Sequence, residues 1–272
     1  MKLRTLLTLL LVALCSISAS AQQNDEYREA VARYFSLNGG MQVSAPMLKQ
    51  GLVTITNAYV QSGETLPSGY TAETLVDEYI DTRLEKDMIN IYVPIFAESM
   101  TAQQIVKVCN FIDNERGRTA IAHGVQLNTD PVFEQEIMIL CEATAMAIYD
   151  GKPLKPVEMT APKARWELFD QYFRTSNLKT TIFNIIEASL SGANVDEDFK
   201  AKYIEYLQAN YETLVFNCAE NILSDEDLSF MVNLCKLPEY QQMTGIVTEI
   251  SEDPQTLGLA IVECYGKWLQ KQ

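Results

Sequence analysis

Hydrophobic residues recur every three or four positions over most of this chain, which is the spacing of an amphipathic helix. Apolar segments of this kind cover residues 25–37, residues 47–60 and residues 71–99, and each is expected to be helical. Pro94 should kink the third segment, since proline removes a backbone donor and crowds the preceding turn.

Capping residues mark where further helices begin. Thr101 is a good N-cap, and Gln104 stands at the position that completes a capping box. Asp130-Pro131 opens another helix, because Asp accepts backbone N–H bonds and Pro suits the first helical position. Gly151 should end that helix.

The order of these features returns later in the chain. A capping residue followed by an apolar face occurs at residues 101–112 and again at residues 224–235. Two Asp-Pro pairs are each followed, at the same distance, by a cysteine: Asp130-Pro131 by Cys141, and Asp253-Pro254 by Cys264. We interpret both copies as helix starts with a cysteine on an apolar stripe, and therefore as scaffold.

The pattern predicts an all-α protein of about a dozen helices in two tandem, divergent helical-bundle repeats. The first repeat should cover residues 22–150 and the second residues 164–272. Residues 151–163, which are rich in proline and lysine, should form the linker between them.

Residues 1–21 have the features of an export signal: a basic start, a short apolar core and a small-residue cleavage site. The apolar core is too short to stay in the bilayer as a helix, and no other segment suggests a membrane span once the signal is removed. We expect an exported protein, periplasmic or secreted. Lipid attachment at Cys15 is the less favoured alternative, because Leu14 stands where that motif needs a small residue.

Acidic residues outnumber basic ones by 36 to 21, giving a net charge of −15. Such a surface repels phosphate backbones, so nucleic acid is not an expected partner.

Five of the six cysteines follow the expected signal, an odd number for a chain in an oxidising compartment. None form a CxxC pair, so zinc or thioredoxin-like chemistry has no support. We expect no bridge between Cys218 and Cys235, because they lie at different distances from the turn that joins their helices. A bridge between Cys141 and Cys264 is an open alternative.

Candidate chemical motifs are few. His123 is the only histidine, which excludes a multi-histidine metal site, and we interpret it as solvated or capping. Ser176 and Lys179 match an S-x-x-K pattern without its companion motifs, so we regard the match as chance.

Acidic runs at residues 196–198 and 224–227 precede apolar segments and are interpreted as helix starts, not as calcium ligands. An aromatic stripe is expected in the core, with a ligand groove as the alternative: Trp166, Phe169, Tyr172 and Phe173. We assign no catalytic, cofactor-binding or metal-binding residue and expect no cofactor.

Residues 91–142 resemble the bacterial family called domain of unknown function 2059. Phe111 and Gly117 match the first and last residues of its Phe-Tyr-x-Ser-Pro-x-Gly motif, while the three specified residues between them differ. In the second copy only Pro238 keeps its place. The resemblance implies an exported, all-helical protein and transfers no catalytic residue.

Two functions follow from these observations. The favoured one is a non-catalytic binding or interaction module of the bacterial envelope, which would take a protein or a small apolar ligand in a groove between helices. The alternative is an envelope hydrolase whose two carboxylates lie far apart in the sequence. A pocket lined by two or more buried carboxylates would favour the enzyme, and a shallow apolar groove the binding module.

Overall fold

The computed structural model describes residues 21–153, 155–176, 178–192, 195–252 and 254–272, and the regular structure within these ranges is all helical. The expected all-α fold of about a dozen helices is therefore confirmed. The expected signal, residues 1–21, lies outside the described residues apart from Ala21, where the first described helix begins.

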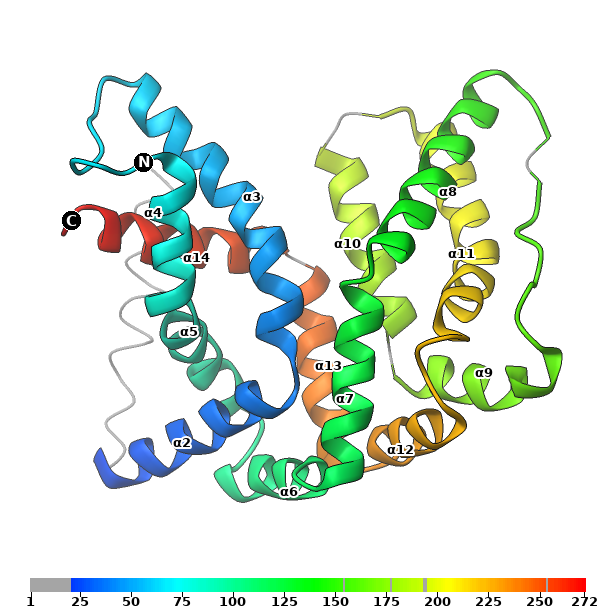
Figure 1. The fold of residues 1–272 in the computed structure, drawn as a ribbon, viewed down its shortest axis with the longest axis horizontal. Helices are drawn as coiled ribbons and strands as arrows, with labels where there is room; N and C mark the ends of the chain where they lie inside the picture. Colours follow the sequence, from blue (N-terminus) through cyan, green and yellow to red (C-terminus); the bar gives the residue numbers. More distant parts are fainter. Residues whose placement is uncertain (1–20, 154, 177, 193–194, 253) are drawn as a thin grey trace.

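Most helices follow one another with short connections, while longer segments span residues 62–71 and 150–162 (Figure 1). The first half of the chain contains α2 (Ala21–Leu37), α3 (Gly40–Gln61), α4 (Ala72–Tyr79), the π-helix η1 (Ile80–Leu84), α5 (Glu85–Ala97), α6 (Ala102–Ile112), α7 (Glu115–Asn128) and α8 (Pro131–Tyr149). The second half contains the 3₁₀ turn η2 (Lys163–Arg165), α9 (Trp166–Thr175), α10 (Leu178–Gly192), α11 (Glu197–Ala219), α12 (Asp225–Cys235), α13 (Pro238–Glu252) and α14 (Pro254–Leu269).

The expected helix starts at Thr101 and Asp130 are confirmed by their capping contacts, whereas Asp253 lies outside the described residues. The Thr101 side chain accepts from the backbone N–H of Gln104, and the Gln104 side chain accepts from Thr101 in return. The Asp130 side chain accepts from the backbone N–H of Val132, and Pro131 is the first residue of α8. Each contact satisfies a backbone donor that a helix start leaves unpaired.

The expected third segment, residues 71–99, is divided differently from the prediction. Helix α5 passes through Pro94 and continues to Ala97, whereas the α geometry is interrupted earlier, at η1. A π-helix widens the backbone by one residue per turn and therefore shifts the side chains that follow.

Two hydrophobic cores hold these helices together. Helices α2 to α5, which contribute to the first, lie on the left of Figure 1, and α8 to α11, which contribute to the second, lie on the right. The first core joins buried residues of α2 to α7 with residues from α12, α13 and α14. The second core joins the end of α7 with α8 to α12. Helix α12 contributes to both, with Phe230 facing the first core and Leu228 the second.

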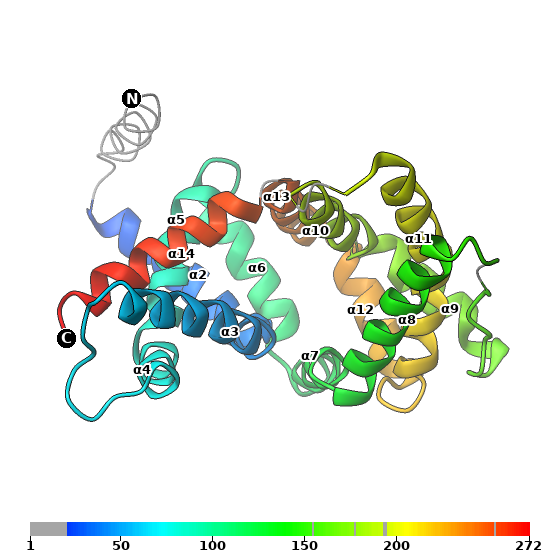
Figure 2. The same cartoon turned by 90° about the horizontal axis from the view of Figure 1, so that it is seen from above.

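Each core contains helices from both of the ranges expected for the repeats. The last helix of the first range, α8, belongs to the second core, and the last helix of the second range, α14, belongs to the first core. Helix α8 packs against α11, while α14 crosses α5 on the other side of the molecule (Figures 1 and 2). Helix α7 likewise packs on α12, and α13 on α6. The packing of α2 on α6 has a counterpart in α9 on α12, as a duplication predicts, and the duplication itself stays a prediction.

The expected linker, residues 151–163, is fixed along α11 by two asparagines. Asn217 accepts from the backbone N–H groups of Thr160 and Ala161 and donates to the carbonyl of Glu158. Asn210 accepts from the backbone N–H of Val157 at 2.6 Å. Residue 154 lies outside the described residues.

Candidate binding surface

Helix α8 is apolar on the side that faces the protein. Phe133 and Leu140 are buried in the second core, and Ile137 and Cys141 pack against it from the same side. The Thr144 hydroxyl, also buried, donates to the carbonyl of Leu140. This side contacts α11 and accounts for the stable position of α8.

Helix α8 is also apolar on the side that faces solvent. Five large apolar side chains on this side are between 48% and 87% exposed, and we call them the outer face of α8: Val132, Met138, Ile139, Met146 and Tyr149. Val132, Ile139 and Met146 follow at seven-residue intervals, close to two helical turns, so they form one stripe.

A helix that is apolar on all sides is normally buried or spans a membrane. In the part of the chain that the structure describes, no helix is long and apolar enough to cross a membrane. Because its five large apolar side chains are exposed, the outer face of α8 is an apolar surface that the described residues leave open, and contiguous surfaces of this kind often mark interaction sites.

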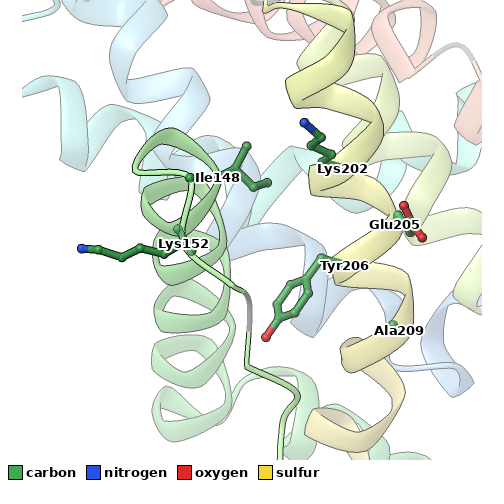
Figure 3. Close-up of a pocket in the computed structure, with 8 residues that line it drawn as sticks. Ile148, Lys152, Lys202, Glu205, Tyr206 and Ala209 are labelled. Atoms are coloured by element: carbon green, nitrogen blue, oxygen red, sulfur yellow. The ribbon is translucent and has the colours of Figure 1, made fainter.

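An open groove of about 460 Å³ lies between the end of α8 and α11. Ala147 and Ile148 line it from α8, and Tyr206 and Ala209 line it from α11. Figure 3 shows Ile148 and Tyr206 on facing sides of the groove, with Lys152 extending away from it. Burial raises the pKa of the Tyr206 hydroxyl, so the side chain that lines the groove here is uncharged.

The groove is continuous with the outer face of α8. Ala143, which is exposed, lies one helical turn after Ile139 of the outer face, and Ala147 of the groove lies one turn after Ala143. An elongated apolar ligand or helix on the outer face would therefore reach the groove at the C-terminal end of α8.

Acidic residues border this surface. Glu134, Glu136 and Glu142 lie on α8, and the sequence of α8 contains no lysine or arginine. Among the described residues these three carboxylates form no salt bridge. The two lysines of the groove are already paired, Lys152 with Asp150 and Lys202 with Asp198.

A second cleft, of about 530 Å³, lies where α7 meets the start of α12. The Nδ1–H of His123 donates to a carboxylate oxygen of Asp227, which is buried, at 2.8 Å. Asp227 also accepts from the backbone N–H and hydroxyl of Ser224, forming the capping box of α12. His123 therefore lies within α7 and joins this helix to α12. From the sequence we had interpreted it as a solvated or capping histidine.

The Asp227 carboxylate is held in its charged form. Burial raises its pKa, but the hydrogen bonds from Ser224 and His123 outweigh burial, so that the pKa lies below 3.8. The contact between His123 and Asp227 could not be found from sequence spacing, because the two residues are 104 positions apart.

The other sequence candidates have structural roles. Asp196 caps α11 by accepting from the backbone N–H of Asp198, as expected for an acidic helix start. Of the aromatic stripe, Phe169 and Phe173 are fully buried in the second core, while Trp166 and Tyr172 pack at its edge. Ser176 ends α9 and donates to the carbonyl of Phe173, and the neighbouring residue 177 lies outside the described residues.

The five cysteines that the structure describes are all free. Cys218 lies near Glu136 of α8, whereas Cys235 bonds to Thr175 of α9, so the two face different helices. Cys141 packs against the second core, and Cys264 lies near Asp87 beside the first. The bridge left open from the sequence, between Cys141 and Cys264, is therefore absent.

Asp170 of α9 and Glu212 of α11 contact each other, and burial together with the bond to Asp170 raises the pKa of Glu212, while Arg174 also pairs with Asp170. The fully buried carboxylates of the described residues form no such pair. Asp87 and Asp227 are the buried carboxylates there, and they belong to separate networks. Asp87 accepts from Tyr79 and pairs with Arg83, while Asp227 is bonded to Ser224 and His123. The same part of the chain shows no cluster of three metal-ligating side chains.

No protein-family model matches the chain, no curated protein matches its sequence, and no solved structure matches its fold. The resemblance of residues 91–142 to domain of unknown function 2059 stays a prediction.

Proposed function

We propose that this protein is a non-catalytic binding module of the bacterial envelope and that it contacts its partner through the outer face of α8. The observation that carries this proposal is the exposed stripe of Val132, Ile139 and Met146 on a helix whose opposite side is fully packed. Covering the stripe would contribute part of the roughly 1.5–3 kcal/mol that full burial of a large apolar side chain supplies, because Val132, Ile139 and Met146 are already partly covered.

Export rests on the signal at residues 1–21 and on the resemblance to an exported family. Both come from the sequence, and mass spectrometry of the mature protein tests them. We expect a chain that begins at Gln22. A lipid-modified N-terminus at Cys15 would instead place the protein on a membrane surface.

Site-specific photo-crosslinking in the producing cell tests the binding surface. A benzophenone amino acid at position 146 should give one defined adduct in the envelope fraction. The same group at position 55 is the matched control, because Ile55 is an exposed apolar residue on α3. Equal adducts from both positions, or none from position 146, would contradict the proposed surface.

A parallel screen of glycan and peptide hydrolysis addresses the enzymatic alternative. The favoured function predicts no turnover. Turnover that disappears on substitution of one carboxylate, with the fold intact by circular dichroism, would replace the binding module with a hydrolase.

A further inference from the structure

The outer face of α8 has the geometry of a helix-binding surface. From Val132 to Tyr149 it extends about 26 Å along the helix axis. Its seven-residue spacing matches the repeat with which two helices pack at a shallow angle. The backbone groups in the middle of α8 are bonded within the helix, so a partner gains no main-chain hydrogen bonds there and must bind through side chains.

The charges on α8 determine which helix fits. Glu136 precedes Ile139 by three residues, and Glu142 precedes Met146 by four, so each carboxylate is next to an apolar side chain of the stripe. These two carboxylates are about 120° apart around the helix and so lie on opposite edges of the stripe. Glu134 lies further round, next to Met138. The surface is thus an apolar stripe with carboxylates on both edges and no basic residue on its helix.

Other occupants are disfavoured by the same charges. A second copy of the chain would bring the carboxylates of one α8 against those of the other, and like charges in contact oppose association. An anionic membrane surface would be repelled in the same way, by a protein whose net charge is −15.

We infer that the outer face of α8 binds a basic amphipathic helix of another protein, one that carries lysine or arginine on both edges of its apolar stripe. This inference rests on the proposed function and adds the chemistry of the partner. The partner's apolar side chains would contact Ile139 and Met146, and its basic side chains would pair with the glutamates at the edges.

Two synthetic peptides of about 18 residues, long enough to follow the stripe, test the inference. Both carry leucine at the same helical spacing, and their polar positions are all lysine in one and all glutamate in the other. Fluorescence anisotropy should show the exported chain binding the lysine peptide and not the glutamate peptide.

Variants of the chain separate specific binding from general attraction to an acidic protein. Ile139→Gln with Met146→Gln should weaken binding of the lysine peptide by about tenfold or more. Ile55→Gln with Val60→Gln removes two exposed apolar residues of α3 and should leave binding unchanged. Changing the three glutamates of α8 to lysine should transfer the preference to the glutamate peptide.

Several results would overturn the inference. Equal binding of the lysine peptide by the Ile139/Met146 variant would mean general electrostatic attraction. Self-association that the same variant abolishes would identify a second copy as the occupant, and flotation with phosphatidylglycerol vesicles would identify a membrane. If binding depends on the outer face but not on peptide charge, the inference fails, while a crosslink from position 146 would still support the proposed function.

Discussion

Gly117 lies at the start of α7, where α6 and α12 approach it closely. A Cβ atom at this position would lie 2.2 Å from the carbonyl oxygen of Ile112 and 2.8 Å from the ring of Phe230. Gly117→Ala should therefore lower the free energy of unfolding by about 1–3 kcal/mol, because backbone cannot move away as a flexible side chain can. The helix propensity of alanine, worth about 1 kcal/mol, does not offset this clash.

Urea denaturation of two variants measures the effect of Gly117. A Cβ atom added to Gly245 of α13 would meet no heavy atom within 4 Å, so Gly245→Ala is the matched control. It should raise the free energy of unfolding by about 0.5–1 kcal/mol. If both substitutions stabilise the protein, the close contact at Gly117 is wrong.

Asp227 should make stability depend on pH in a defined direction. Its folded-state pKa lies below its ordinary value of 3.8, so its charge contributes stability that is fully present above that value. The contribution is lost as the pH falls through the folded-state pKa. At pH 7 Asp227→Asn should cost about 1–3 kcal/mol, since it weakens the bonds to His123 and Ser224.

Urea denaturation between pH 7 and pH 3 tests this prediction for Asp227. The difference between wild type and Asp227→Asn should be constant near neutrality and shrink in acid. Glu226→Gln, an exposed neighbour on α12, is the control and should change stability little at any pH. A difference that grows as the pH falls would contradict the assigned direction.

At the scale of elements, the linker at residues 158–161 depends on one side chain of α11. Asn217→Ala leaves three backbone groups of the linker without their partner. The segment should then open about tenfold more often or more, because each lost bond is worth about 1 kcal/mol. Glu-C protease, which cleaves after Glu158, should cut the variant faster by the same factor.

Mass spectrometry of the cleavage products isolates the Glu158 site from other glutamates. Gln208→Ala removes an exposed polar side chain from the same helix and should leave the rate unchanged. Equal rates for Asn217→Ala and Gln208→Ala would show that the linker is held by other contacts.

The sequence was informative about elements wherever a local rule decided the outcome. Thr101 and Asp130 were predicted as caps because the atoms that satisfy a helix start lie within three residues of it. Periodicity also predicted burial of Phe169 and Phe173. The interruption at η1 was missed because proline marks a break in the sequence, whereas a π-helix has no such marker.

The candidate site was missed for a different reason. Periodicity indicates which side of a helix is apolar, but α8 is apolar on both sides, so the sequence could not say which one the protein covers. The cover comes from α11, more than 45 residues later, and a spacing argument cannot identify a partner at that distance. The outer face of α8 could be identified only from the structure, which shows that α11 covers the opposite side of the helix.

At the scale of the whole molecule, the exchange of helices should make the two cores unfold together. Helix α12 places Phe230 and Leu234 in the first core and Leu228 and Met231 in the second, so neither core is complete without it. Helix α14 returns from the second half of the chain to the first core, where it buries Ile261 and Tyr265. Unfolding of either core would therefore remove part of the other.

The two tryptophans of the chain can report on each core separately. Trp166 contacts Phe216 in the second core, and Trp268 contacts Tyr79 beside the first. Trp166→Phe and Trp268→Phe each leave a single fluorescent reporter. Circular dichroism measures the small effect of each substitution on stability. After correction for that effect, the two variants should show the same urea midpoint by fluorescence.

A core substitution gives the stricter test of this coupling. Met243 of α13 is fully buried in the first core, so Met243→Ala should cost about 2–5 kcal/mol. If the cores form one cooperative unit, Trp166 fluorescence in the second core should report as large a drop in midpoint as Trp268 fluorescence in the first. A drop confined to Trp268 would mean that α12 separates two independent units, and that the exchanged helices contribute packing to each core without coupling them.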